Sequence, residues 1–177
     1  MSRLLLLRHA KSSWADPGVA DHDRPLAQRG RRAAERMAGV IADRDDLLPD
    51  RILCSPSRRT RETLAPLSAR IGDASRALIL DELYEPAAGD YRNVIATHGG
   101  SAHHLLVIGH NPAIHATALS LVGSADDKTA LQIATKFPTG ALAVIDFDTR
   151  IWGEIQPKCG RLEAFFRPRD LEKADDD

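Results

Sequence analysis

An arginine and a histidine stand side by side directly after the apolar run at residues 4–7. Arg8 carries a planar fork of N–H donors that suits phosphate oxygens. A neutral imidazole at His9 can attack phosphorus and form a covalent phosphoenzyme, provided that one ring nitrogen is unprotonated and the other donates a hydrogen bond that fixes the tautomer. The neighbouring positive charge disfavours the imidazolium. The pair therefore indicates phosphoryl transfer, although an isolated histidine is more often a structural residue.

Three more arginines gather in residues 55–63, which read Ser-Pro-Ser-Arg-Arg-Thr-Arg-Glu-Thr. The segment predicts a helix start, where backbone amides and the helix dipole favour an anion. Successive helical residues point about 100° apart, so we do not expect Arg58 and Arg59 to reach the same phosphate. A solvated basic helix face accounts for at least one of the three arginines.

A second histidine follows the apolar run 105–108, in Gly109-His110-Asn111-Pro112. Glycine permits a close approach of the backbone at this point. The imidazole of His110 could donate to phosphoryl oxygens and to the charge that develops in the transition state. A helix-capping turn with an incidental histidine is the alternative, and the motif alone does not decide between the two.

These residues must be positioned by alternating strands and helices. Such alternation predicts an α/β fold, a three-layer α/β/α sandwich with a mostly parallel central sheet. The chain divides into a single domain over residues 1–168 and a charged C-terminal tail over 169–177, which we expect to fray. Apolar runs predict strands at 4–7, 51–54, 77–80, 105–108, 141–147 and 162–166, and helical spacing predicts helices at 26–43, 55–71, 91–98 and 113–122.

In parallel sheets, ligands bind outside the carboxyl ends of the strands. Four chemically functional segments follow four predicted strands directly. They are Arg8-His9, Ser55-Pro56, Asp81-Glu82 and Gly109-His110. The pattern therefore places all four segments at one edge of the sheet.

The ordered set resembles a known family. Leu-Leu-Leu-Arg-His-Ala, the arginine-rich segment and Gly-His-Asn-Pro are similar to the motifs of the histidine phosphatase superfamily. Arg-His-Ala-Lys-Ser and Gly-His-Asn-Pro, with the segments 23–30 and 137–143, resemble its small bacterial phosphohistidine phosphatase (SixA-like) branch. The resemblance covers residues 3–168 and implies a phosphoglycerate mutase-like fold.

The resemblance also implies a role for each matching residue. His9 would be the phosphorylated residue, and Arg8, Arg59 and His110 would complete the phosphate-binding pocket. In the Ser-Pro-x-x-Arg pattern, Arg59 rather than Arg58 matches the second phosphate-binding arginine.

The general acid is the least defined of the predicted catalytic residues. Larger superfamily members place an acidic residue after the third strand, where Glu82 is the nearest candidate and Asp81 and Glu85 are close by. The small branch often lacks a clear acid. The P–N bond of phosphohistidine is already labile, whereas an alkoxide leaving group needs stronger help from a positioned acid.

Composition limits the other possibilities. The net charge is −1, with 24 basic and 25 acidic side chains, so we expect no bulk attraction to nucleic acid or to a membrane surface. The short apolar run at the start does not read as a signal peptide, which predicts a cytoplasmic protein. Four histidines, at 98, 103, 104 and 115, lack carboxylates at ligand spacing, so we expect no metal and no cofactor.

The predicted function is hydrolysis of phosphohistidine, or of a related phosphomonoester, through a covalent intermediate on His9. The partner would be a phosphorylated protein or a small phosphorylated molecule, within signal transduction if it is a protein. Two alternatives stay open: a broad phosphomonoesterase or mutase of small metabolites, and a non-catalytic module that binds phosphoproteins.

Overall fold

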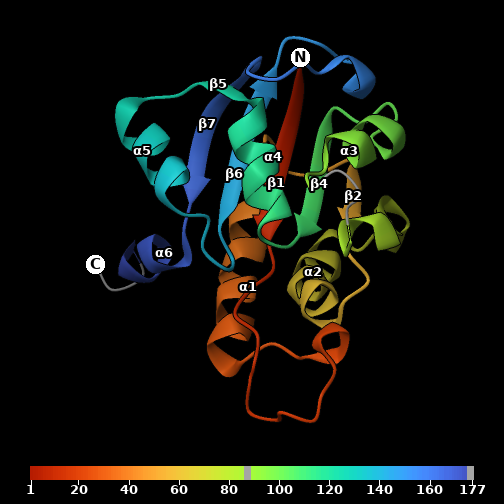
Figure 1. The fold of residues 1–177 in the computed structure, drawn as a ribbon, viewed down its shortest axis with the longest axis vertical. Coiled ribbons are helices and arrows are strands. Elements are labelled where there is room, and N and C mark those ends of the chain that lie inside the picture. Colours follow the sequence, from red (N-terminus) through yellow and green to blue (C-terminus); the bar gives the residue numbers. More distant parts are fainter. Residues whose placement is uncertain (86–88, 175–177) are drawn as a thin grey trace.

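The computed structural model describes residues 1–85 and 89–174, which form one sheet with helices on both sides (Figure 1). The sheet has seven strands in the order β3-β2-β4-β1-β6-β7-β5. All neighbouring pairs are parallel except β1–β6 and β6–β7, so β6 alone runs against the other six strands. The strands are β1 (Ser2–Arg8), β2 (Arg51–Cys54), β3 (Ala77–Ile79), β4 (His104–Gly109), β5 (Val122–Ser124), β6 (Leu142–Phe147) and β7 (Gly160–Phe166).

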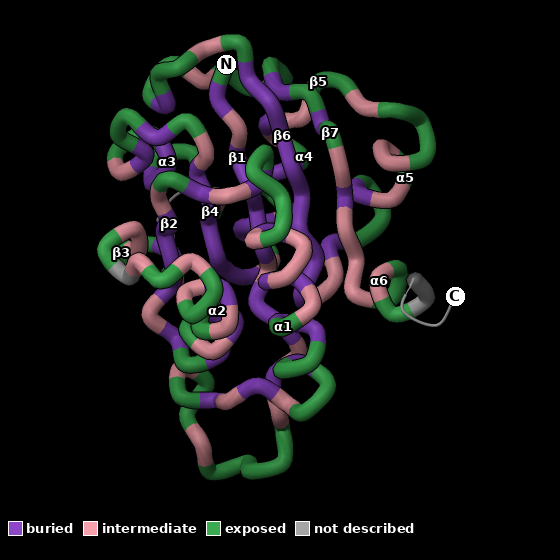
Figure 2. The backbone as a smooth tube through the Cα atoms, turned by 180° about the vertical axis from the view of Figure 1, so that it is seen from behind, coloured by how far each residue is buried: buried purple, intermediate pink, exposed green. Residues whose placement is uncertain are grey.

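Helices cover both faces of this sheet. Figure 1 looks onto the face that α3, α4 and α5 cover, and Figure 2 looks from behind onto α1 and α2, with buried strands between the two layers. Short 3-10 helices occupy 21–23 (η1), 74–76 (η2), 81–83 (η3) and 152–154 (η4). The α-helices are α1 (Gln28–Ala42), α2 (Arg58–Ile71), α3 (Arg92–His98), α4 (Ala113–Leu121), α5 (Asp127–Thr135) and α6 (Pro168–Ala174). The predicted three-layer, mostly parallel α/β fold is confirmed.

The apolar run in β1 separates the two halves of the core. Leu4 and Leu6 pack with α3 and α4, whereas Leu5 and Leu7 pack with α1 and α2. Because successive strand residues point to opposite faces, a continuous run of four leucines serves both cores. All four side chains are at most 3% exposed, so β1 is fixed at the centre of the sheet.

Several boundaries differ from the sequence-based expectation. Helix α2 begins at Arg58, and its N-terminal cap is Ser57, whose Oγ accepts a hydrogen bond from the backbone N–H of Thr60. The predicted helix start at Ser55 was three residues too early, because Ser55 lies before the helix, where its hydroxyl contacts His110.

Two elements that follow α4, strand β5 and helix α5, were not predicted from the sequence. Strand β5 has only three residues, and helix α5 buries only Ile133, so both are short elements with few buried side chains. The tail that we expected to fray, residues 169–177, overlaps helix α6. In the structure Leu171 of this helix packs against the part of the core that lies under α1 and α2. The last three residues of the predicted tail lie outside the described part of the chain. Within residues 1–85 and 89–174, no helix has both the length and the apolar content that a membrane span requires.

Candidate active site

Three of the four predicted segments meet at the carboxyl ends of the adjacent strands β2, β4 and β1; the fourth, Asp81-Glu82, follows the outer strand β3. Backbone hydrogen bonds continue the sheet just beyond the strands: the N–H of His9 donates to Gly109 O at 3.0 Å, and the N–H of Ser55 donates to Ile108 O at 3.0 Å. A parallel register brings these ends to the same level. His9, Ser55 and His110 therefore leave the sheet side by side.

His9 is held in a single tautomer. Its Nδ1 lies 2.7 Å from the backbone carbonyl oxygen of Ala10, and a carbonyl oxygen can only accept a hydrogen bond. Nδ1 must therefore carry the proton, and Nε2 keeps the lone pair. The side chain is 7% exposed, so little solvent competes for this arrangement. The free nitrogen required of a nucleophile is thus set by the backbone of the next residue.

Arg59 reaches the two histidines from the first turn of α2. Its Nη2 lies 3.3 Å from Nδ1 of His110, and the rings of His9 and His110 have centroids 5.2 Å apart. Arginine can only donate, so Nδ1 of His110 accepts and the ring proton lies on Nε2, 2.7 Å from Oγ of Ser55. Arg58 instead points outward and pairs with Glu62 at 2.7 Å. The structure brings Arg59, and not Arg58, into the pocket.

Arg8 brings a further guanidinium close to His9 and Arg59. Its Nη1 donates to the backbone oxygen of Phe137 at 2.8 Å, which orients the guanidinium. Among the described residues, no hydrogen-bond acceptor contacts the buried Nε–H of Arg8, Arg24 or Arg59. Buried donors of this kind normally have partners, so three convergent guanidinium groups with free N–H bonds favour an anion.

Electrostatics keep both imidazoles neutral. Burial contributes most to lowering the pKa of His9 to about 4, and the charges of Arg59, Arg8 and Arg24 lower it further, against the opposing hydrogen bond to Ala10. Burial likewise lowers the pKa of His110 to about 3, helped by His9 and Arg59. Charge repulsion from the arginines was the expected cause for His9, but removal of the ring from water is the larger one.

Glu82 lies on η3, at the end of the outer strand β3. Its carboxylate is 57% exposed, and Oε1 lies 3.4 Å from Nε2 of His98 at the end of α3. It makes no hydrogen bond to Arg8, His9, Arg59 or His110 within the described chain. The structure therefore does not bring Glu82 together with the other four predicted residues, and its role as general acid stays a prediction.

Asp21 is the acidic residue that contacts the pocket. Its Oδ2 accepts hydrogen bonds from Nη2 of Arg59 at 3.0 Å and from the hydroxyl of Tyr84 at 2.9 Å, and its backbone oxygen accepts from Nη1 of Arg59 at 2.6 Å. Burial raises the pKa of this carboxyl, but the hydrogen bonds from Tyr84 and Arg59 outweigh it, so the pKa lies below its ordinary value. Asp21 is therefore ionised at neutral pH.

The loop that carries Asp21 also supplies Arg24, which was not assigned to the pocket from the sequence. Nη2 of Arg24 donates to Oγ of Ser12 at 2.8 Å, and its guanidinium stacks 3.5 Å from the centroid of the Trp14 ring. The sequence signals for this loop were the dense charge in Asp21-His22-Asp23-Arg24 and the family resemblance of residues 23–30, and neither placed Arg24 in the pocket. Only the fold shows that the loop brings the guanidinium of Arg24 close to His9.

Metal-ligating side chains do not gather in the described structure. Across residues 1–85 and 89–174, no group of three or more histidine, cysteine, aspartate or glutamate side chains is placed to hold a metal ion. The charges available to an anion in this pocket are those of the arginines.

Comparison with known proteins identifies the family. A family model for the histidine phosphatase superfamily (branch 1) matches residues 4–99, which is more than half of the chain. The chain belongs to this superfamily. It is also 38% identical to an uncharacterized protein of Mycobacterium tuberculosis over 92% of this chain and all of that protein, and 34% identical to an uncharacterized protein of Mycobacterium leprae over the same share of both.

Solved histidine phosphatase structures have the same fold. A crystal structure from Agrobacterium tumefaciens, assigned as a phosphohistidine phosphatase SixA, superimposes with a TM-score of 0.75 at 31% identity, covering 94% of this chain and 98% of that one. A SixA complexed with tungstate gives a TM-score of 0.70 at 22% identity, over 96% of this chain and 99% of that one. The predicted resemblance to the SixA-like branch is confirmed, and the superfamily with its neighbours supports a phosphatase.

The pKa of His9 predicts the acid limit of activity. A nucleophilic ring must be unprotonated, so kcat/KM, corrected for ionisation of the substrate, should stay level as the pH falls from 7 to about 5 and should drop below about 4. An unperturbed histidine would cause the drop near 6.5. Arg24→Gln removes one of the charges that lower the pKa and should move the drop to higher pH. A drop near 6.5 in the wild type would contradict the assignment.

Proposed function

We propose that this protein hydrolyses phosphohistidine, or a related phosphomonoester, through a covalent phosphohistidine intermediate on His9. The observation that carries the proposal is the contact between Nδ1 of His9 and the carbonyl oxygen of Ala10, which leaves Nε2 with a lone pair among three guanidinium groups. A fixed, neutral nucleophile beside preorganised positive charge suits attack on phosphorus.

The reaction has two steps. Arg8 and Arg59 hold the phosphoryl oxygens. His110 can donate to one of these oxygens from Nδ1 once Arg59 leaves that nitrogen and the Ser55 hydroxyl donates to Nε2, which places the ring proton on Nδ1. Nε2 of His9 bonds to phosphorus as the bond from phosphorus to the leaving atom breaks, and the leaving atom takes a proton. Water then attacks the phosphorus, releasing inorganic phosphate and restoring the lone pair of Nε2. We propose that no metal takes part, because the arginines supply the charge stabilisation.

The state of the acidic residues favours phosphohistidine over an ester. Asp21, which contacts the pocket, is ionised and has no proton to give at neutral pH, and Glu82 is exposed beside His98. An imidazole leaving group accepts a proton readily from solvent, whereas an alkoxide requires a positioned acid. A pocket without a poised acid therefore suits a phosphoramidate substrate. We place that substrate on a phosphorylated protein of the cytoplasm, consistent with a role in signal transduction.

His9→Ala tests the covalent step. Removing the nucleophile should lower kcat on a phosphohistidine protein and on p-nitrophenyl phosphate by about 10³-fold or more. The wild type, quenched in alkali after brief reaction with labelled substrate, should carry label on His9. His103→Ala removes an exposed imidazole outside the pocket and should behave like the wild type. Turnover that survives His9→Ala would contradict the mechanism, and capture of the phosphoprotein without turnover would favour a binding module.

Glu82→Gln tests the acid. If Glu82 protonates a leaving group, the variant should lose about 10²-fold on a phosphoserine peptide and much less on a phosphohistidine peptide. Glu85→Gln removes a neighbouring exposed charge and should leave both rates unchanged. Equal losses on both substrates would count against an acid that acts only on ester leaving groups.

A further inference from the structure

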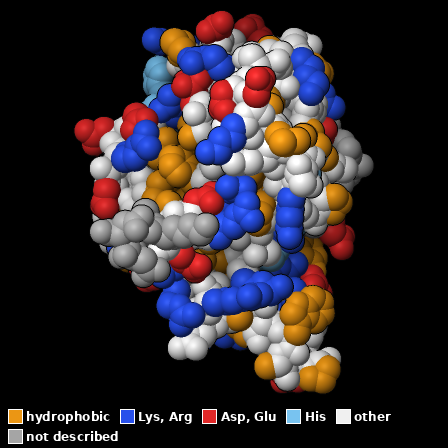
Figure 3. Space-filling model, turned by 90° about the vertical axis from the view of Figure 1, so that its left-hand side faces the viewer, with side chains coloured by type: hydrophobic (Ala, Val, Ile, Leu, Met, Phe, Trp, Pro, Cys, Tyr) orange, Lys and Arg blue, Asp and Glu red, His pale blue; other side chains and the backbone are white. Residues whose placement is uncertain are grey.

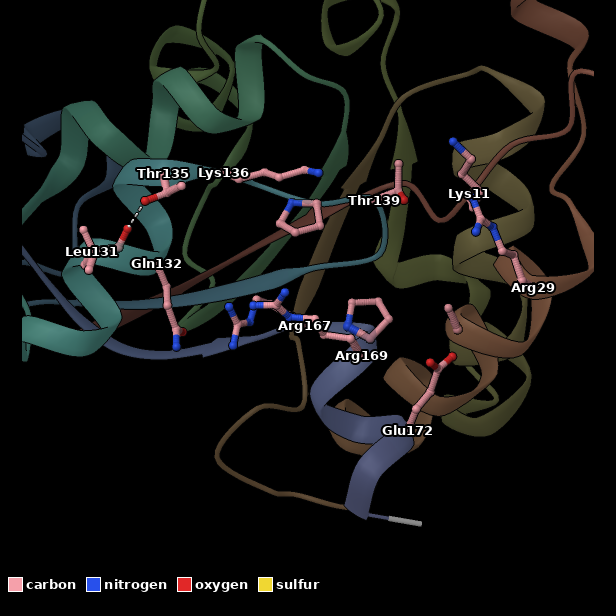
Figure 4. Close-up of a pocket in the computed structure, with 13 residues that line it drawn as sticks. Lys11, Arg29, Leu131, Gln132, Thr135, Lys136, Thr139, Arg167, Arg169 and Glu172 are labelled. Atoms are coloured by element: carbon pink, nitrogen blue, oxygen red, sulfur yellow. Dashed lines mark hydrogen bonds between the residues drawn. The ribbon is translucent and has the colours of Figure 1, made fainter. Parts of the chain in front are cut away.

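A groove of about 610 Å³ lies beside the phosphate pocket, bounded by α1, α5, residues 136–139 and α6. Figure 4 shows Lys11 and Arg29 at one end of this groove and Leu131, Gln132 and Thr135 of α5 at the other. None of its lining residues is among those that hold His9 or the phosphate. The groove is therefore a second site that the hydrolysis reaction itself does not require.

Backbone contacts join the groove to the phosphate pocket. The N–H of Gly140 donates to the carbonyl oxygens of Arg8 at 3.1 Å and His9 at 3.0 Å, so the segment that lines the groove is tied to the nucleophile. A Cβ at Gly140 would lie 3.0 Å from Pro168 and 3.8 Å from Ala10, which places the start of α6 next to the same backbone. A ligand bound through its phosphate at His9 thus has the groove directly beside it.

The charge of the groove differs from that of the whole chain. The chain carries a net charge of −1, but the groove is lined by five cations and a single carboxylate, Glu172. Figure 3 shows this side of the molecule, where lysine and arginine side chains gather in the middle of the view. The cations come from four separate parts of the chain: Lys11, Arg29, Lys136, and Arg167 with Arg169.

Only some of these cations are neutralised within the protein. Arg167 forms a two-pronged pair with Asp170 at 2.6 and 3.1 Å, and the carboxylate of Glu172 pairs with Arg36 outside the groove at 3.1 Å. Lys11, Arg29 and Lys136 make no ion pair or side-chain hydrogen bond with any residue in 1–85 or 89–174. Three unpaired charges around one hollow attract an anionic ligand.

We propose that this groove binds an acidic segment of the phosphorylated protein, a run of aspartate or glutamate next to the phosphorylated residue. This inference rests on the proposed function and adds the substrate's charge pattern to it. The cations are spread along the groove rather than converging on one point, which matches carboxylates on successive residues of a chain. The groove also has apolar lining: Leu131 at its α5 end is 70% exposed and can pack against the methylene groups of a peptide.

Two matched double variants test the groove. R29Q/K136Q removes two of its unpaired charges. R32Q/K128Q removes two exposed charges from α1 and α5 that do not line the groove, so it is the control. Both should turn over p-nitrophenyl phosphate like the wild type, because that substrate occupies only the phosphate pocket.

The kinetic arm compares two phosphohistidine peptides of equal length, one with three glutamates beside the phosphohistidine and one with three glutamines. The wild type and R32Q/K128Q should prefer the glutamate peptide by about tenfold in kcat/KM, and R29Q/K136Q by about threefold or less. The preference should weaken as salt is raised from about 0.05 to about 0.3 M. An equal preference in all three proteins would overturn the inference.

A binding arm separates this inference from the proposed function. Fluorescein-labelled hexaglutamate should bind the wild type and R32Q/K128Q more tightly than R29Q/K136Q by fluorescence anisotropy, and labelled hexaglutamine should not bind. If hexaglutamate binds in this way but neither peptide is hydrolysed, the groove still binds an acidic segment and the proposed hydrolysis is wrong. If tripolyphosphate binds through Arg29 and Lys136 and hexaglutamate does not, the ligand is a small polyanion and the assignment to a protein segment is overturned.

Discussion

The hydrogen bond between Nδ1 of His9 and the backbone oxygen of Ala10 sets the chemistry of the whole pocket. The carbonyl cannot donate, so it forces the proton onto Nδ1 and the lone pair onto Nε2. A hydrogen bond of this kind favours the protonated ring, yet burial and the surrounding arginines still hold the pKa of His9 near 4. The protein thus fixes the orientation of the proposed nucleophile and keeps its ring uncharged at the same time.

The rest of the structure maintains that arrangement. Strand β1 holds His9 at the centre of the sheet, and the first turn of α2, which follows β2, brings Arg59 to the same pocket. The hydroxyl of Thr63 accepts from the N–H of Ala10 at 3.0 Å and donates to the carbonyl of Arg59 at 2.7 Å. One threonine therefore links the backbone that fixes the tautomer to the helix that brings Arg59 into the pocket. Phe137 O orients Arg8 from the other side.

Which residues of the site stand at the strand ends could be predicted from the sequence, because those signals are local. Arg8, His9, Arg59 and His110 each follow a buried strand or open a helix, and the carboxyl ends of parallel strands must meet. Contacts that depend on loop geometry could not be predicted in this way. Asp21 reaches Arg59 across 38 positions in the chain, and Ser55 binds His110 across 55, with no periodic pattern to connect them. Helix α5 was missed because it buries a single residue, although Asp126 caps it through Thr129.

The most direct measurement of the central claim is the protonation state of His9 in the free enzyme, by nitrogen-15 NMR of labelled imidazole at pH 7. The account predicts a neutral ring with its proton on Nδ1 and an Nε2 resonance typical of an unprotonated nitrogen. An imidazolium, or a neutral ring protonated at Nε2, would leave no lone pair facing the phosphate and would contradict the account.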